Sequence, residues 1–167
     1  YQEEKAANRT EGVLDGVDPA AVIERNTEQF RVLCSAIPET VTLGYHLCFG
    51  TLGGWPRFAP DDLSGAVKMA NAFIEYSSRR VDWVHIPVLD ISDEAFFAPL
   101  ADLRPAGARI YLGMVHNMDG FGDRLAAARK FFPEFGLGAF CGFGRESREK
   151  LPDILSDHLK AAELAGV

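Results

Sequence analysis

The chain has 167 residues, of which 47% are hydrophobic and 25% are charged, and its formal net charge is −7. This ordinary globular composition fits one domain with a hydrophobic core, and the absence of a basic block argues against nucleic acid and anionic membranes as partners. No apolar run reaches the length of a membrane-spanning helix, no signal-peptide pattern opens the chain, and the three cysteines are too few for a disulfide framework. The sequence therefore predicts a cytoplasmic protein.

The chain opens with a lead-in and a first helix. Residues 1–17 are polar with scattered glycines, and we interpret them as a lead-in segment or the end of an upstream element. The predicted domain covers residues 18–167. Asp18 before a proline is typical of a helix start, and the apolar face of this helix ends before Pro38. Cys34 lies on that face, so we expect it in the core, where free cysteines are common.

A strand, a loop and a second helix follow. The apolar, β-rich run over residues 40–48 predicts the strand. The loop over residues 49–60 is rich in glycine, proline and aromatic residues, a composition that fits either a loop lining a site or one packed on the core. The amphipathic helix after it ends near Arg79 and Arg80, where cations complement the helix dipole, and we expect this end to be solvated.

The second half of the chain alternates strands with helices. Apolar runs predict three more strands, and amphipathic stretches predict the helices between and after them. The predicted strands cover residues 81–88, 108–115 and 136–141, and the predicted helices cover about 93–103, 121–132 and the tail after Arg145.

This order predicts the fold class. Near-continuous apolar strands that alternate with amphipathic helices are typical of an α/β protein with a parallel sheet. Four strand–helix units amount to half of an eight-unit barrel, whose complete form takes ~250 residues. We therefore predict the C-terminal half of a (β/α)8 TIM barrel, and an open flavodoxin-like parallel sheet is the alternative.

Residues with reactive or polar side chains follow each predicted strand. Sites in parallel α/β folds lie at the carboxyl ends of the strands, so these residues share one edge of the sheet. His46 and Cys48 are two residues apart on a strand and point to the same side, and their N/S donor pair suits zinc. The other residues at this edge are Asp90, His116, Asn117 and Cys141.

The pattern of His46-x-Cys48 on one strand end and Cys141-Gly142-Phe143-Gly144-Arg145 after the last strand resembles a known family. It is similar to the C-terminal catalytic domain of cobalamin-independent methionine synthase. More broadly, it resembles the superfamily that also includes uroporphyrinogen decarboxylase and the zinc-dependent epoxide–thiol transferases. The resemblance runs from about Thr40 to Leu164, which corresponds to the second half of that family's barrel.

The resemblance implies a zinc-dependent enzyme that transfers a methyl or other alkyl group involving a substrate thiol. In that family a His, a Cys, a Glu and a second Cys hold zinc, and His46, Cys48 and Cys141 match three of these ligands. Pro87 stands at the position of the Glu ligand. Asp90 or a water would fill the gap, although three protein ligands and an open position also make a catalytic zinc site. His85 would serve if it faced inward, and is otherwise a core residue.

The resemblance also assigns His116 the role of a proton donor to the leaving group, with Asn117, Asp119 and Asp90 as substrate contacts. The expected partner is a small molecule, possibly a thiol. Two other hypotheses stay open: a metal-independent decarboxylase or lyase of the same superfamily, and a non-catalytic half-barrel that dimerises or pairs with a partner supplying the other four strands.

Overall fold

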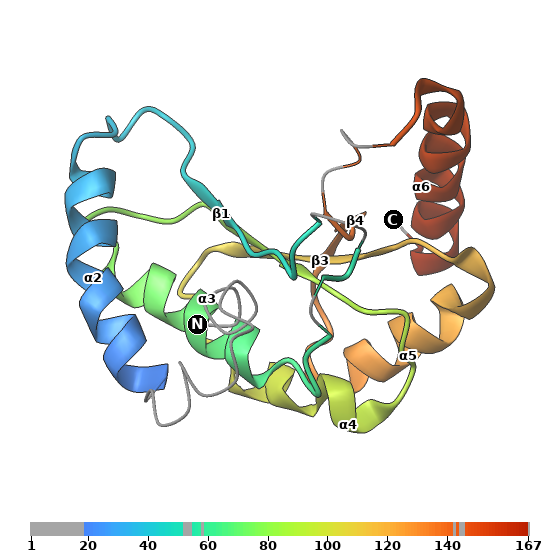
Figure 1. Cartoon of the computed structure of the whole chain (residues 1–167), viewed down its shortest axis with the longest axis horizontal. Helices are drawn as coiled ribbons and strands as arrows, with labels where there is room; N and C mark the ends of the chain where they lie inside the picture. Colours follow the sequence, from blue (N-terminus) through green and yellow to red (C-terminus); the bar gives the residue numbers. More distant parts are fainter. Residues whose placement is uncertain (1–18, 52–54, 58, 142, 144–145, 167) are drawn as a thin grey trace.

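The structure is a computed structural model that describes residues 19–51, 55–57, 59–141, 143 and 146–166. The predicted lead-in and most of the segment 142–145 lie outside these residues. The described chain is an α/β fold with one four-stranded parallel sheet in the order β1-β2-β3-β4 (Figure 1). The strands are β1 (Gly44–His46), β2 (Trp83–Pro87), β3 (Arg109–Val115) and β4 (Gly136–Ala139).

The helices follow the predicted order. They are α2 (Pro19–Ser35), α3 (Ser64–Tyr76), α4 (Glu94–Phe97), α5 (Phe121–Phe131) and α6 (Leu151–Ala165), with short 3-10 helices at η1 (Ala98–Asp102), η2 (Met118–Gly120) and η4 (Arg148–Lys150). The predicted helix over about 93–103 is thus an α-turn followed by a 3-10 turn. Asp93 caps it by accepting a hydrogen bond from the backbone N–H of Ala95, which satisfies one of the donors left free at a helix start.

The first strand is shorter than the predicted run over residues 40–48. Asp82 explains where the pairing stops, because its carboxylate accepts a 2.8 Å hydrogen bond from the backbone N–H of Leu43. Just before β1, a side chain therefore takes the N–H of Leu43, while the Leu43 carbonyl still accepts from the backbone N–H of Asp82. The last paired residues are His46 and His85, which lie opposite each other in the register.

The expectation of a solvated end after α3 is wrong for Arg79. This residue is only 9% exposed, and its guanidinium donates hydrogen bonds to the backbone carbonyls of Ile37, Pro38 and Val41. Arg79 thereby satisfies carbonyl groups in the turn between α2 and β1, where no helix or strand partner is available. Arg80 is exposed, as expected.

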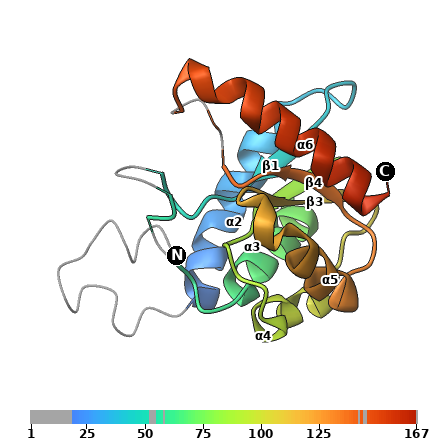
Figure 2. The ribbon, with the colours of Figure 1, turned by 90° about the vertical axis from the view of Figure 1, so that its right-hand side faces the viewer.

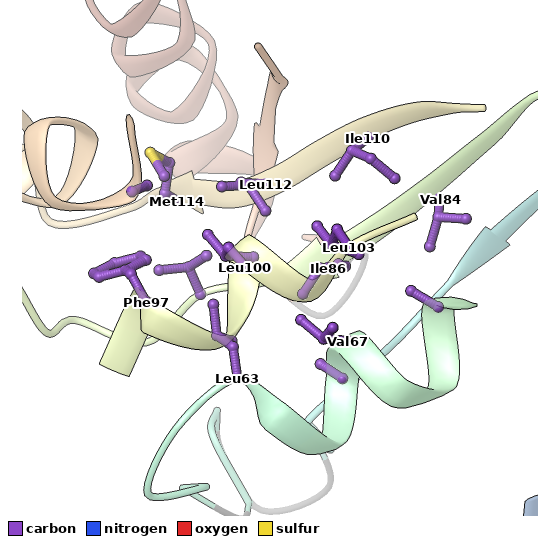
Figure 3. Packing of buried hydrophobic residues seen from close by; sticks show 14 of the residues in the cluster. Leu63, Val67, Val84, Ile86, Phe97, Leu100, Leu103, Ile110, Leu112 and Met114 are labelled. Atoms are coloured by element: carbon purple, nitrogen blue, oxygen red, sulfur yellow. The ribbon is translucent and has the colours of Figure 1, made fainter. Parts of the chain in front are cut away.

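One face of the sheet forms the core. Alternate residues of β2 and β3 point to this face and are almost fully buried against the helices that connect the strands (Figure 3). Helix α6 packs against β4 and α5, with Ala161 fully buried (Figure 2). The facing core residues include Val84, Ile86, Ile110, Leu112 and Met114 from the strands and Leu63, Val67, Phe97, Leu100 and Leu103 from the helices and their ends.

The opposite face of the sheet carries large side chains beside glycines. Trp83, His85 and Tyr111 are only partly buried there. A Cβ atom on Gly44 would lie 1.9 Å from the Trp83 ring, and one on Gly136 would lie 2.4 Å from the Tyr111 ring. Each aromatic ring therefore lies across a glycine of the neighbouring strand, an approach that only glycine permits. Among the described residues, no helix lies over the middle of this face in Figure 1.

Candidate metal centre

The structure brings together the three residues that the sequence proposed as metal ligands. His46 ends β1, Cys48 lies two residues later, and Cys141 lies two residues after the end of β4. The Nε2 atom of His46 is 3.3 Å from Sγ of Cys141, and the two sulfur atoms are 2.9 Å apart. Among the residues that the structure describes, this is the one group of three His, Cys or acidic side chains whose ligand atoms all lie within 4.8 Å of one another.

These donors fit zinc. An imidazole nitrogen and two sulfurs are the ligand types of catalytic and structural zinc sites. In a tetrahedral site the Zn–S and Zn–N bond lengths place two sulfurs about 3.8 Å apart and a nitrogen and a sulfur about 3.5 Å apart. The observed separations of 2.9 and 3.3 Å are within about 1 Å of these values, so small side-chain rotations suffice. None of the three cysteines forms a disulfide.

Backbone geometry supports the position of Cys48. Gly50 donates its N–H to Sγ of Cys48 at 3.2 Å, an interaction that is strongest when the sulfur is negatively charged. The φ angle of Gly50 is +79°, in the region that favours glycine. The glycine that follows the His-x-Cys pair thus has a definite role in turning a backbone donor toward the sulfur.

His85 is a site residue that the sequence left undecided, and the structure places it against the metal ligands. Its Nδ1 atom is 2.8 Å from Nδ1 of His46, and it forms a further hydrogen bond with the backbone carbonyl of Ala139. Burial, and secondarily the neighbouring His46, lower the pKa of His85 to about 4, so the ring is neutral at pH 7. The alternation along β2 gave a signal for this, because Trp83, His85 and Pro87 share the face opposite to Val84 and Ile86.

A groove on the open sheet face leads to this centre. It has a volume of about 560 Å³ and is lined by His46, Trp83, His85, Tyr111, Gly138, Ala139 and Cys141. Its walls are mainly apolar and aromatic, and its polar groups include the two imidazoles and the thiol of Cys141. A small molecule in this groove would contact the donor cluster directly, as in most ligand sites, where a few polar groups stand among apolar walls.

His116 lies in a second cavity at the same edge of the sheet, with a volume of about 490 Å³. Its Nε2–H donates to the backbone carbonyl of Val88 at 2.8 Å, which leaves Nδ1 as the acceptor of the neutral ring. Burial is the main cause that lowers the pKa of His116. The rings of Trp55 and Phe140 lie 5.4 and 5.8 Å from the imidazole, and Phe140 immediately precedes Cys141.

A buried arginine that sequence reasoning missed fixes the end of β3. The Arg124 side chain is fully buried; it donates to Asp90 at 2.5 Å, to the Asn117 carbonyl at 2.8 Å, and to the His116 carbonyl. The amide of Asn117 also donates to the Asp90 carboxylate. Arg124 follows Phe121 by three residues and precedes Ala128 by four, a spacing that could have placed it on the buried face of α5.

The other residues named from the sequence have three different outcomes. Asp90 does not lie in the donor cluster, because its carboxylate is used by Arg124 and Asn117; its predicted contact with substrate, and that of Asn117, stays a prediction. Asp119 is exposed in η2 and also stays a predicted contact. Cys34 is confirmed as a core residue, 3% exposed and 2.7 Å from the hydroxyl of Tyr45. Gly142, Gly144 and Arg145 lie outside the described residues.

Comparisons of the chain with protein-family models, curated proteins and solved structures gave no match. Within the described part of the chain, no helix combines the length and the apolar character that crossing a bilayer requires.

Proposed function

We propose that this chain carries the metal-binding half of a (β/α)8 barrel and acts in the zinc-dependent transfer of a methyl or other alkyl group to or from a thiol. The observation that carries the proposal is that His46, Cys48 and Cys141 lie together although they follow the two outer strands of the sheet. His46 and Cys141 are 95 residues apart along the chain. A set of N and S donors at the carboxyl edge of parallel strands supports a site of chemistry more than a packing role.

The sheet supports the barrel part of the proposal. Its strands follow one another in the order β1-β2-β3-β4 without a reversal, as they do around a barrel, whereas a doubly wound sheet reverses its strand order at a switch point. The partly exposed rings of Trp83, His85 and Tyr111 lie on the face that would be the barrel interior. In this proposal four further strands from outside the described residues complete the barrel.

His46, Cys48 and Cys141 would hold the metal, and the groove beside them would admit the substrate sulfur. Bound zinc would supply a Lewis acid that lowers the pKa of a substrate thiol to near neutrality. His116 would accept the proton of the thiol and later donate it to the leaving group. Because its ring is neutral with Nδ1 unprotonated, it first accepts the proton of the thiol at Nδ1.

The alkyl transfer then balances without another reactant. The sulfur forms a bond to the electrophilic carbon as the bond from that carbon to its leaving group breaks. The proton held at Nδ1 of His116 passes to the leaving group. The proton donor that the family resemblance implies is therefore a base before it is an acid.

The activity is tested by incubating the zinc-loaded protein with a small thiol and a panel of methyl donors, and by detecting the thioether by mass spectrometry. The proposal predicts a product that disappears with a chelator, returns with zinc and is lost in Cys48→Ser. Cys34→Ser is the matched control and should keep the activity, because Cys34 lies in the core away from the donor cluster. A product that forms equally in metal-free protein would refute zinc-dependent transfer.

A further inference from the structure

The contact between the two imidazoles at the edge of β1 and β2 has no role in the proposed function so far. His46 and His85 are paired in the strand register, and their Nδ1 atoms are 2.8 Å apart. A neutral imidazole carries a proton on only one of its two nitrogens, so exactly one of these Nδ1 atoms can be the donor. Which ring donates decides whether Nε2 of His46, which faces Cys141, carries a proton or a lone pair.

The backbone of β4 determines the direction of this hydrogen bond. Nε2 of His85 and the carbonyl oxygen of Ala139 both lie against Gly113, 2.8 and 2.6 Å from where a Cβ atom would stand, and a carbonyl can only accept a hydrogen bond. Since Nδ1 of His85 faces His46, the proton on His85 must be on Nε2, which points to Ala139. The Nδ1 atom of His85 is then an acceptor, the proton between the rings belongs to His46, and Nε2 of His46 is left with a lone pair 3.3 Å from Sγ of Cys141.

Two glycines leave room for the His85 ring in this orientation. A Cβ atom on Gly113 of β3 would lie 2.8 Å from Nε2 of His85, and one on Gly138 of β4 would lie 2.9 Å from the same atom. Any larger residue at either position would displace the ring. The sheet therefore leaves a space of imidazole size between the ligand His46 and the Ala139 carbonyl.

We infer that His85 is a positioning residue for the metal centre: it accepts the Nδ1 proton of His46 and so holds the Nε2 lone pair of His46 toward the cysteines. Metal-binding histidines generally donate their other N–H to a fixed acceptor, most often a carboxylate or a carbonyl, and here a second imidazole takes that place. The inference rests on the proposed metal centre for its function, but the hydrogen-bond direction exists without the metal.

The first measurement is nitrogen-15 NMR of the four imidazoles in metal-free protein at mildly alkaline pH, where histidines are neutral. The inference predicts that His46 is protonated on Nδ1 and His85 on Nε2. His85→Phe should remove the acceptor and shift His46 toward Nε2 protonation, whereas His85→Asn should preserve the wild-type state, because the Asn oxygen stands where Nδ1 stood. His158→Asn, on α6, is the control and should change neither signal.

The second measurement is the zinc dissociation constant, from competition with a chromophoric chelator. His85→Phe should bind zinc about 10–100-fold more weakly than wild type, and His85→Asn should recover most of the loss. Wild-type His46 protonated on Nε2, or His85→Phe with unchanged tautomer and affinity, would overturn the inference. If His85→Phe does not fold, the wild-type tautomers and the His85→Asn affinity still decide. If wild type binds no zinc, the proposed function fails, and the NMR result separately decides the role of His85.

Discussion

Replacing Asp90 by alanine should destabilise the protein far more than its exposure suggests. The Asp90 side chain is 50% exposed, but its partner Arg124 is 0% exposed. Removing the carboxylate leaves a fully buried guanidinium without its counter-charge, and breaking a buried pair in this way costs 3–5 kcal/mol. Because carbonyls at the end of β3 still accept from Arg124, we expect a loss at the lower end, about 3 kcal/mol, in the free energy of unfolding.

The assay is urea unfolding followed by circular dichroism, with Asp119→Ala as the control for an exposed carboxylate at the same edge. The control should cost less than about 1 kcal/mol. Adding Arg124→Met to Asp90→Ala removes the unpaired charge, so the double variant should be less destabilised than the sum of the single variants, by about 2 kcal/mol. An Asp90→Ala protein within about 0.5 kcal/mol of wild type would refute the reasoning.

Three further predictions concern other parts of the molecule. Burial lowers the pKa of His116 below its ordinary 6.5, so as the pH falls the His116 ring binds a proton in the unfolded chain before it does so in the folded protein. The free energy of unfolding should therefore fall as the pH drops below about 6.5, and urea titrations should show a smaller fall in His116→Gln. Arg79→Met should lower the free energy of unfolding by about 2–4 kcal/mol in the same assay, because it leaves buried carbonyls without donors; an effect below about 0.5 kcal/mol would contradict this. Diamide should oxidise Cys48 and Cys141 to a disulfide, and thiol counting should then find one free thiol, Cys34; three remaining thiols would contradict the 2.9 Å approach of the two sulfurs.

The sequence predicted the order of elements because that order depends on local patterns. The apolar run of β3 and the amphipathic face of α3 appear where periodicity placed them, and the parallel sheet follows from their alternation. The convergence of His46 with Cys141 was predictable for the same reason, since the carboxyl ends of parallel strands meet at one edge.

What the sequence did not predict depends on contacts between distant segments. In the sequence, Arg79 looks like an ordinary cation at a helix end. Only the position of the turn near Pro38 shows that its guanidinium donates hydrogen bonds to backbone carbonyls of that turn. Arg124 was missed for the same reason, because its buried guanidinium pairs with Asp90, which follows a different strand, β2. The inward direction of His85 was available from the alternation of β2, but its hydrogen bond to His46 required the register between the two strands.

The most direct test of the metal centre is a cobalt(II) titration of the reduced protein, followed by its visible and near-ultraviolet spectrum. Binding through two thiolates and an imidazole should give about one cobalt per chain, tetrahedral visible bands and thiolate-to-metal charge-transfer absorption. Cys48→Ser and Cys141→Ser should each weaken or abolish the charge-transfer absorption, while Cys34→Ser should match wild type. A wild-type spectrum without thiolate charge transfer, or one that Cys34→Ser alters as much as Cys48→Ser does, would contradict a metal centre formed by His46, Cys48 and Cys141.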